Sequence, residues 1–528
     1  MSRHGSVVAL WLIVVAYGAF GLGFIERTGF DSPDGRVYCL WDDAMISMQY
    51  ARNLAEGHGL VWNAGGARVQ GISNPAVAFV MAGLHWLPLG ERTLPLAFQL
   101  LNLAVLLLVL VLSFDLARLL VPERLDVRVG AVAATALAGP LALWSLRGSD
   151  MGFVTLWLLV GVHGLARAEA GRRVRLGLLL AALGPGLLIR PDVVLYYGLL
   201  IGAAALAGER RAASIGTAVA GLVLGGWIAF AWIYYGDPLP NTYYLKATGH
   251  PRALVLAKGA ELLGWWIPYL LVPLAFAAVA LWAGRRKTVH RLCGAIIVAS
   301  IGYSFWVGGD WMAPHGIRYM VPMLPLLSIL MVEGVAQSAD RLVRGRPQAA
   351  RFASWGVVTA ACALGVLANP PAARGEWLRL EEPMLLSYNR SNYFLALYLA
   401  RHTEPSTSIG VRWAGAPIYF SRRPGVDLLG KSDRHIARLS VDRFRPGHSK
   451  WDWDYVMNEL RPDVFADRND ALVERADFRR QYLRVAKGDR YFYLHRGSLS
   501  KLRDRSVRLF DLETGRETTR AEVEASVR

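Results

Sequence analysis

The chain has 528 residues, of which 54% are hydrophobic and only 19% charged, and its mean hydropathy is +0.30. This composition excludes a soluble globular protein of this length and indicates a membrane protein. The formal net charge of +17 would suit a nucleic-acid-binding protein, but a charge sum has meaning only once the charges are placed relative to the bilayer. The three cysteines lie far apart, which excludes a disulfide framework and a CxxC metal pattern.

The N-terminal residues 1–24 have a basic start and an apolar run of about 19 residues, long enough to cross about 30 Å of hydrocarbon. No small-residue cleavage site follows, so we predict a retained first span. Similar runs give about eleven predicted spans, of which the pair from 175 to 206 is short for a bilayer. The further runs lie near 94–114, 128–146, 150–167, 175–190, 192–206, 212–235, 258–283, 291–307, 316–336 and 352–369.

The distribution of Lys and Arg predicts the orientation of these spans, because basic loops lie on the cytoplasmic side. All the basic loops fall on one side, together with the N-terminus, if residues 75–90 do not cross the membrane. That segment is short and contains His85 and Trp86, so we predict a juxtamembrane helix. The outer loop 26–93 and everything after residue 370 then face the outside. Topology therefore explains much of the positive charge, and nucleic acid is not a predicted partner.

The predicted fold class is mainly α: a polytopic helical membrane module, residues 1–369, followed by a small α/β periplasmic domain, residues 370–499. In that domain the patterns predict a helix and two short strands, and then a hairpin with a Lys-Gly-Asp turn. The tail, residues 500–528, is mostly charged, and we expect it to be poorly ordered. The predicted elements are the helix 386–403, the strands 408–411 and 426–429, and the hairpin 482–496.

Five polar stretches stand at span ends on the predicted outer side. Taken singly, each has a structural explanation: acids at a helix start complement the helix dipole, an arginine snorkels, and Tyr and Trp form an interfacial belt. Together they bring acids that can take a proton to the same membrane face as cations that can hold a phosphate. The stretches are 42–75, 147–152, 189–192, 234–249 and 307–322.

This combination matches sugar transfer from a lipid-linked phosphate. An alcohol is a poor nucleophile at neutral pH, so a carboxylate must take its proton, and cations must neutralise the leaving phosphate. The sequence has no GxxxxGK[ST] phosphate loop and no strand-GxGxxG-helix unit, which fits a donor that arrives in the membrane. The alternative is a polyprenyl-linked lipid or polysaccharide transporter or flippase, in which the same cations bind a headgroup without chemistry. Transporters tend to have internal repeats and midplane charges, which we do not find.

The run DDAMISMQYARNLAEGHGLVWNAGGARVQGISNP, residues 42–75, resembles the signature of bacterial integral-membrane glycosyltransferases of the GT-C fold, which include mycobacterial arabinofuranosyltransferases. PNTYYLKATG, GGDWMAPHGIRYMVPMLP and RPGHSKWDWDYV resemble later landmarks of that family. The resemblance implies a catalytic aspartate in the first outer loop, a juxtamembrane helix after it, and an inverting single displacement of polyprenyl phosphate. It also implies decaprenylphosphoryl-arabinose as donor. The chain departs from the family at Gly148-Ser149-Asp150-Met151, where a glutamate is expected.

From these residues we predict a site on the outer face of a bacterial inner membrane. Either Asp42 or Asp43 is the base, with Asp42 favoured, and the other orients the acceptor or holds a cation. Arg52 is expected to neutralise this acid pair. A divalent cation stays open as a cofactor, because paired carboxylates can bind one although no His or Cys spacing supports it. The predicted partners are the lipid bilayer, a polyprenyl-phosphate-linked sugar and a cell-envelope polysaccharide acceptor. The remaining predicted site residues are Arg190, Lys246, His315 and Arg318 for the donor phosphate, and His58, Asn74, His448 and Lys450 for acceptor or supporting roles.

Overall fold

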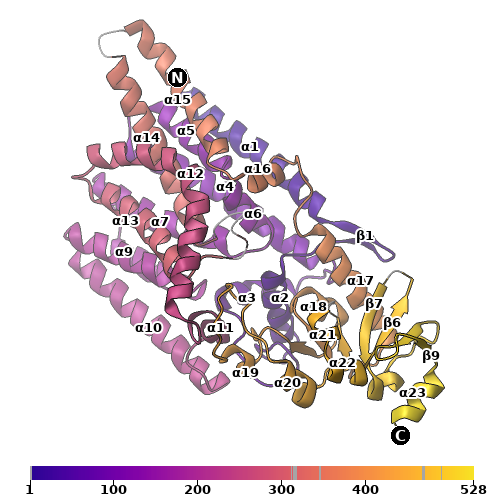
Figure 1. The fold of residues 1–528 in the computed structure, drawn as a ribbon. Coiled ribbons are helices and arrows are strands. Elements are labelled where there is room, and N and C mark those ends of the chain that lie inside the picture. The colour runs from indigo at the N-terminus through magenta and orange to yellow at the C-terminus, as the bar shows by residue number, and fades with distance from the viewer. Residues whose placement is uncertain are drawn as a thin grey trace.

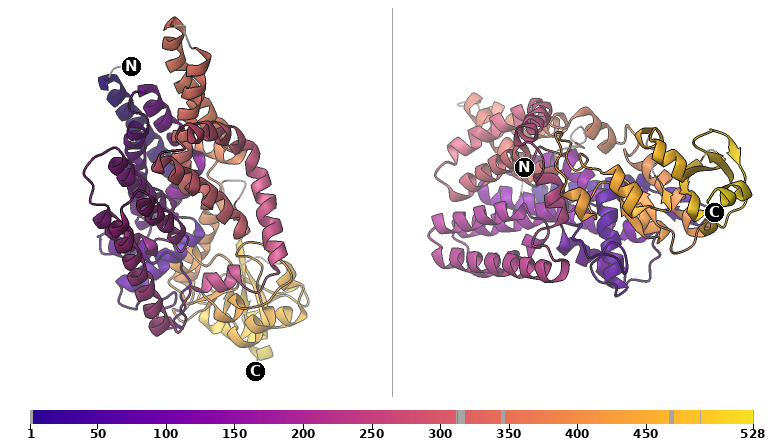
Figure 2. Two further views of the ribbon diagram at one scale, coloured as in Figure 1. Left: turned by 90° about the vertical axis from the view of Figure 1, so that its left-hand side faces the viewer. Right: turned by 60° about the horizontal axis from the view of Figure 1, so that its bottom comes forward.

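The structure is a computed structural model that describes residues 3–310, 312, 318–343, 347–466, 470–488 and 490–527. It has two parts: a bundle of long helices and a C-terminal part built on a mixed sheet. The N-terminus lies at the end of the bundle that points away from the C-terminal part (Figure 1). The same arrangement is seen when the molecule is turned (Figure 2).

The described residues contain seven helices long and apolar enough to cross a membrane, or nine if two bent helix pairs each count as one span. The predicted number of eleven was therefore too high. The two surplus segments are short: the helix 193–206 has 14 residues, or about 21 Å at about 1.5 Å per residue, less than the hydrocarbon thickness. The long helices are α1 (Arg3–Thr28), α4 (Leu94–Leu120), α7 (Met151–Glu169), α10 (Arg210–Tyr235), α12 (Arg252–Ala283), α13 (Thr288–Trp306) and α14 (Leu324–Leu342), which the 3-10 turn η3 (Arg318–Met323) precedes.

The bent pairs and the short apolar helices complete the bundle. The break in the first pair turns the chain by 48°, and the break in the second turns it by 109°. The pairs are α5 (Leu125–Ala136) with α6 (Gly139–Leu146), and α15 (Pro347–Leu367) with α16 (Pro371–Trp377). The short apolar helices are α3 (Pro75–Leu84), α8 (Leu176–Leu183) with η1 (Gly184–Leu188), and α9 (Val193–Leu206).

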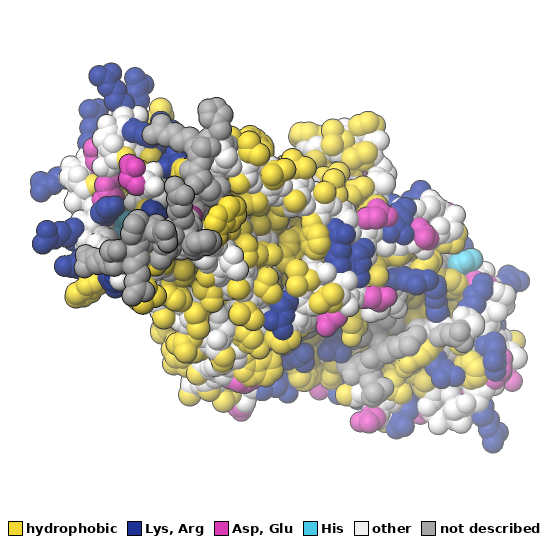
Figure 3. Space-filling view, turned by 90° about the horizontal axis from the view of Figure 1, so that it is seen from above, with side chains coloured by type: hydrophobic (Ala, Val, Ile, Leu, Met, Phe, Trp, Pro, Cys, Tyr) yellow, Lys and Arg dark blue, Asp and Glu magenta, His cyan; other side chains and the backbone are white. Residues whose placement is uncertain are grey.

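The surface of the bundle is that of a multi-pass integral membrane protein. On the face seen from above, hydrophobic side chains cover the middle, Lys and Arg gather at the left, and charges of both signs lie at the right (Figure 3). Helix α10 is the most outlying span, with 6% of its apolar window buried, whereas α14 is central, with 94% buried. An apolar helix with so little protein cover is stable only when lipid covers it.

Segment 75–90 forms the ten-residue helix α3 and then a turn. Pro75 takes the first helical position, where its missing N–H costs nothing. Ten residues span about 15 Å, too little to cross the hydrocarbon. After α3 the side chain of Trp86 is 77% exposed, as expected of a residue in the membrane interface. The helix agrees with the juxtamembrane segment predicted from the basic loops.

The C-terminal part contains a seven-stranded sheet in the order β4-β3-β5-β7-β6-β8-β9. The strands β4, β3 and β5 are parallel, and the remaining pairs are antiparallel, including the predicted hairpin of β6 with β7. The strands are β3 (Ile409–Val411), β4 (Gly425–Asp427), β5 (Val464–Phe465), β6 (Tyr482–Lys487), β7 (Arg490–His495), β8 (Arg508–Asp511) and β9 (Glu517–Thr518). The helices are α17 (Leu386–His402), α18 (Ala416–Ser421), α19 (Arg434–Ala437), α20 (Trp453–Tyr455), η4 (Val456–Leu460), α21 (Asp470–Val473), α22 (Ala476–Gln481), η5 (Arg496–Lys501) and α23 (Arg520–Val527).

The expectation of a poorly ordered tail at 500–528 was wrong. Strand β8 pairs with β6, β9 pairs with β8, and the following helix α23 buries Val523 in the core of the sheet. The charged composition hid these elements because each strand is short and one side chain of α23 supplies its contact with the core. The ordered C-terminal part therefore extends beyond residue 499.

Helix α2 (Asp42–Ala55) connects the two parts of the molecule. Met45 and Met48 belong to the core of the helical bundle, whereas Ile46 and Tyr50 belong to the core of the C-terminal part. A helix buried on both sides is fixed in position and in rotation. Its first turn, which carries both aspartates, therefore lies at the junction of the two parts. The other elements on this side are the hairpin β1 (Phe30–Ser32) with β2 (Gly35–Val37), and α11 (Asn241–Ala247).

Candidate active site

A cavity of about 280 Å³ lies at the junction of the helical bundle and the C-terminal part. Its volume is close to the lower end of the about 300–1,000 Å³ found for small-molecule sites. Each of the five polar stretches singled out in the sequence contributes to its wall. The contributing segments are 43–47 and 71–74, 148–150, 190–192, 239–247, and 307–310 with 318–319; the C-terminal part adds Lys431 and residues 444–448.

Asp43 lines this cavity and is held by two cations. Its Oδ1 accepts a hydrogen bond from the Lys431 ammonium, and its Oδ2 lies 3.5 Å from Nη1 of Arg318. Burial alone raises the pKa of Asp43, but the charges of Lys431, Lys246 and Arg318 outweigh it and hold the pKa below its usual range. The side chain is 29% exposed. Asp43 is therefore ionised and accessible from the cavity.

Asp42 has a different environment, although it is the neighbouring residue. It is not among the residues that line the cavity, and only 6% of it is exposed. Its Oδ1 accepts the backbone N–H of Gly415 at 3.0 Å, at the start of α18. Burial raises the pKa of Asp42 to about 6. From the sequence Asp42 was favoured as the base, but of the two acids it is Asp43 that faces the cavity.

Arg190, a predicted ligand of the donor phosphate, lines the cavity, but carboxylates already neutralise it. Its Nε donates to Asp192 at 2.8 Å and its Nη1 donates to Asp150 at 3.2 Å. Asp150 stands in the segment where the sequence departs from the expected glutamate, and it lines the cavity. The loop 147–152 thus supplies an acid to the wall, and this acid contacts the arginine.

Two cations of the wall have no carboxylate partner at ion-pair distance among the described residues. They are Lys246, on α11, and Arg252, at the start of α12. Arg252 lies over the ring of Trp306, 3.7 Å from its centroid, and donates to the Trp306 carbonyl at 2.5 Å. Arg252 was not predicted from the sequence, where it reads as an ordinary residue after a proline. An anion that enters the cavity finds these two charges available.

Asn74 and His448 line the cavity, but neither carries a positive charge at neutral pH. Asn74 accepts a hydrogen bond from the Ser47 hydroxyl at 2.9 Å. Burial, with Lys431 nearby, lowers the pKa of His448 to about 4. His448 is therefore neutral under ordinary conditions and can offer hydrogen bonds to an uncharged ligand.

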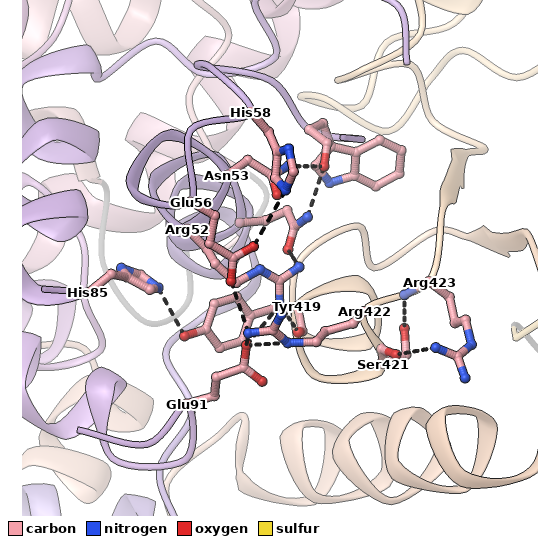
Figure 4. Close-up of polar contacts among 12 residues, drawn as sticks. Arg52, Asn53, Glu56, His58, His85, Glu91, Tyr419, Ser421, Arg422 and Arg423 are labelled. Carbon is pink, nitrogen blue, oxygen red and sulfur yellow. Dashed lines mark hydrogen bonds and ion pairs between the residues drawn. The ribbon is translucent and has the colours of Figure 1, made fainter. Parts of the chain in front are cut away.

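Besides Asp42, three predicted residues lie outside the wall. Lys450 is fully buried and donates to the carbonyls of Tyr244 at 2.9 Å and Ala437 at 2.6 Å, so it fixes α11 against the C-terminal part. His58 is half exposed beside Glu56. Arg52 does not neutralise the acid pair: it donates to Glu91 and to the Tyr419 carbonyl, as Figure 4 shows. The sequence could not separate these roles, because successive residues of a helix point in different directions.

His315 lies outside the described residues. Among the residues that the structure describes, no three His, Cys, Asp or Glu side chains come together as a metal site. Lys431, in contrast, was missed by the sequence analysis. It stands in a polar turn after the short strand β4, 388 residues after Asp43, and nothing in the sequence connects the two.

The arrangement of helices and sheet is the GT-C fold. The chain is similar to ArnT from Cupriavidus metallidurans in the apo state, with a TM-score of 0.56 and 15% identity over 94% of this chain and 98% of that chain. It is also similar to the Archaeoglobus fulgidus oligosaccharyltransferase tethered with an acceptor peptide, with a TM-score of 0.56 and 11% identity over 96% of this chain and 76% of that chain. At these identities the likeness concerns the fold alone.

Two sequence comparisons add to the structural ones. The chain is 25% identical to the terminal β-(1→2)-arabinofuranosyltransferase of Mycobacterium tuberculosis over 366 residues. This match covers 61% of the chain and about half, 55%, of that relative. Residues 386–510 match a family model described as a domain of unknown function, DUF8728. The matched region includes Lys431 and the 444–448 segment of the cavity wall.

Proposed function

We propose that the protein is a membrane glycosyltransferase that moves a sugar from a polyprenyl-phosphate donor to a cell-envelope glycan. The observation that carries this proposal is the ionised, accessible carboxylate of Asp43 in a cavity whose wall also has two cations, Lys246 and Arg252, with no carboxylate partner in the part of the chain that the structure describes. A base and an anion site in one enclosure are what displacement of a phosphate by a hydroxyl requires. A site that only carries a lipid headgroup has no use for the base.

In the proposed reaction Asp43 takes the proton of the acceptor hydroxyl as its oxygen bonds to the anomeric carbon of the sugar. The bond from that carbon to the phosphate oxygen breaks, and polyprenyl phosphate leaves with the electron pair. Attack and departure on opposite faces of the ring invert the anomeric configuration. The proton passes to Asp43 while the C–O bond forms, when the hydroxyl is much more acidic than a free alcohol.

We assign the donor phosphate to Lys246 and Arg252, with Arg318 as a third cation at the base of the site. Arg318 contacts Asp43 and also Asp310, whose Oδ2 lies 3.2 Å away, so it is partly neutralised. Arg190 positions the loops that carry Asp150 and Asp192. His315 remains a candidate from the sequence. The structure of ArnT bound to undecaprenyl phosphate, a protein of the same fold, supports a polyprenyl phosphate as the lipid.

The proposed location is the outer face of a bacterial inner membrane. The basic loops are predicted from the sequence to lie on the same side as the N-terminus, which lies at the end of the bundle away from the C-terminal part (Figure 1). The cavity lies at the junction with the C-terminal part. Loops rich in Lys and Arg lie on the cytoplasmic side of a membrane protein. The cavity, on the other side, then faces the periplasm. Arabinofuranose is the favoured sugar, on the strength of the 25% identical mycobacterial relative.

The test is transfer of labelled sugar by the purified protein from synthetic polyprenyl-phosphate sugars, beginning with arabinofuranose. Asp43→Asn should abolish transfer while the protein still folds. Asp31→Asn is the matched control, because Asp31 belongs to the same outer loop but is 84% exposed and pairs with Arg36. Donor binding without consumption of any donor would instead favour the transporter. Full activity in Asp43→Asn would refute the assignment of the base.

A further inference from the structure

We propose, on the basis of the function above, that Lys431 of the C-terminal part is the positioning residue for the base. It orients the Asp43 carboxylate towards the cavity and keeps it ionised. The helical bundle carries the base, and the region matched by DUF8728 carries the residue that controls it. The C-terminal part would then be needed for the chemical step itself.

The turn that carries Lys431 is fixed by hydrogen bonds from within the C-terminal part. Asp427, at the end of β4, accepts the backbone N–H groups of Leu429, Gly430 and Ser432, at 2.9, 3.1 and 2.6 Å. A carboxylate that accepts three N–H groups closes the turn tightly. The backbone on both sides of Lys431 is therefore held in one conformation.

The same turn is also fixed from the helical bundle. The amide of Asn241, the first residue of α11, donates to the carbonyls of Gly430 and Lys431, at 2.8 and 3.2 Å. The hydroxyl of Tyr50 on α2 lies 3.4 Å from that of Ser432. Gly71 leaves no room for a side chain, because an added Cβ would lie 2.9 Å from the Lys431 carbonyl oxygen. Helices α11 and α2 thus hold the turn that carries Lys431 in a fixed position beside the acid pair.

The side chain of Lys431 is 10% exposed, and its ammonium donates to Asp43. A buried lysine is costly unless its charge is matched. An ordinary structural ion pair would explain this contact, but such a pair needs no opening to a cavity, and both Asp43 and Lys431 line one. Precise support of a catalytic group by a second, well-held residue is the usual form of a preorganised site.

The charges around Asp43 determine what loss of Lys431 would do. Asp43 is faced by Lys431 from the C-terminal part, Lys246 from α11, Arg318 from η3 and Asp42 from its own helix. Burial opposes ionisation of Asp43, and Lys431 is the largest opposing influence. Without it, Asp43 should bind a proton at a pH where the wild type is fully ionised.

The experiment compares pH profiles of kcat/KM for the wild type, Lys431→Met, Lys431→Gln and Lys431→Arg. Each is prepared with and without Asp42→Asn, because Asp42 itself titrates near pH 6. In the Asp42→Asn background, the profile with Lys431 or with Lys431→Arg should be flat down to about pH 5, and the neutral variants should lose activity about tenfold per pH unit below a limb that lies at higher pH. Lys487→Met is the control, since Lys487 pairs with Asp504 in the same domain but away from the cavity.

Infrared difference spectra of each protein against its Asp43→Asn form give a readout independent of activity. On acidification, a protonated-carboxyl band should appear at a higher pH in Lys431→Met than in the wild type. A loss of rate that is equal at every pH, with no such difference in the band, would overturn the inference. Absence of transfer by the wild type would instead count against the proposed function, and the spectra would still decide the role of Lys431. If Lys431→Met does not fold, Lys431→Gln, which keeps a hydrogen-bond donor, decides it.

Discussion

The backbone N–H of Gly415 donates to Oδ1 of Asp42 at 3.0 Å and so joins the first residue of α2 to the start of α18. This bond ties the helix that carries the acid pair to the C-terminal part. It also gives the two neighbouring acids different roles. Asp42 faces the protein and Asp43 faces the cavity, as expected for successive residues of a helix.

Asp42→Asn should stabilise the protein at neutral pH. Burial raises the pKa of Asp42 from 3.8 to about 6, so the folded state favours the protonated acid. The stability that the protonated acid contributes is present at low pH and is lost as the pH rises through about 6. At neutral pH the buried charge of Asp42 therefore lowers the free energy of unfolding by up to about 3 kcal/mol. Asn can still accept the Gly415 N–H and carries no charge. Thermal unfolding in detergent should show a gain at about pH 8 that vanishes near pH 4.

Asp43→Asn, in contrast, should destabilise the protein at neutral pH. The pKa of Asp43 is lowered, so its ionised form adds stability that is present at neutral pH and is lost only under strong acid. Asp43→Asn removes the partner of the buried Lys431 and should lower the unfolding temperature. Equal effects of the two substitutions at neutral pH would contradict the different environments described here.

Substitution of Lys246 should weaken donor binding, whereas substitution of Arg190 should lower the stability of the protein. Lys246→Met removes a cation with no carboxylate partner among the described residues, so KM for the donor should rise about tenfold to a hundredfold with little change in unfolding temperature. Arg190→Met leaves Asp150 and Asp192 buried without their cation and should cost about 3–5 kcal/mol of stability. Donor titrations and unfolding curves of both variants check this. A normal donor KM in Lys246→Met would remove it from the phosphate site.

Helical periodicity and turn patterns predicted much of the fold correctly. The helix at 386–402 and the hairpin of β6 and β7 were predicted within a residue or two, and residues 75–84 form the expected short helix. The number of spans was overestimated, because composition alone does not show whether a short apolar helix crosses the bilayer. The tail was misjudged because two- and four-residue strands carry almost no periodic signal.

For the site, the sequence located the segments but not the side chains. All five polar stretches contribute to the cavity wall, since span ends on one face converge. Which residue of a stretch faces inward depends on helix rotation, and Arg52 was misplaced for that reason. Lys431 could not be found at all, because its contact with Asp43 joins residues 388 positions apart. Such a contact exists only after the two parts of the chain have docked.

Arg52→Met should destabilise the protein far more than Arg422→Met, although both arginines contact Glu91. Arg52 is buried and donates to Tyr419 at 2.5 Å and Gln49 at 2.6 Å, so its loss leaves several buried acceptors unpaired, at about 3–5 kcal/mol. The side chain of Arg422 is 53% exposed, so solvent screens its ion pairs and the expected loss is below about 1 kcal/mol. Figure 4 shows both side chains at this junction. Thermal unfolding of the two variants measures the difference, and a similar loss in both would refute it.

The contacts of the two aspartates leave little room for a metal ion. Asp43 already has a cation at each oxygen, Lys431 and Arg318, and Asp42 uses an oxygen for Gly415. A divalent cation would have to displace Lys431 and compete with its charge, so we predict that a chelator leaves sugar transfer by the wild type unchanged. In Lys431→Met, Asp43 loses that cation, and a divalent cation can take its place. Added Mg²⁺ or Mn²⁺ should then restore part of the activity of this variant only. Loss of wild-type transfer on chelation, restored by one of these ions, would show instead that the acid pair binds a metal and that Lys431 moves away to admit it.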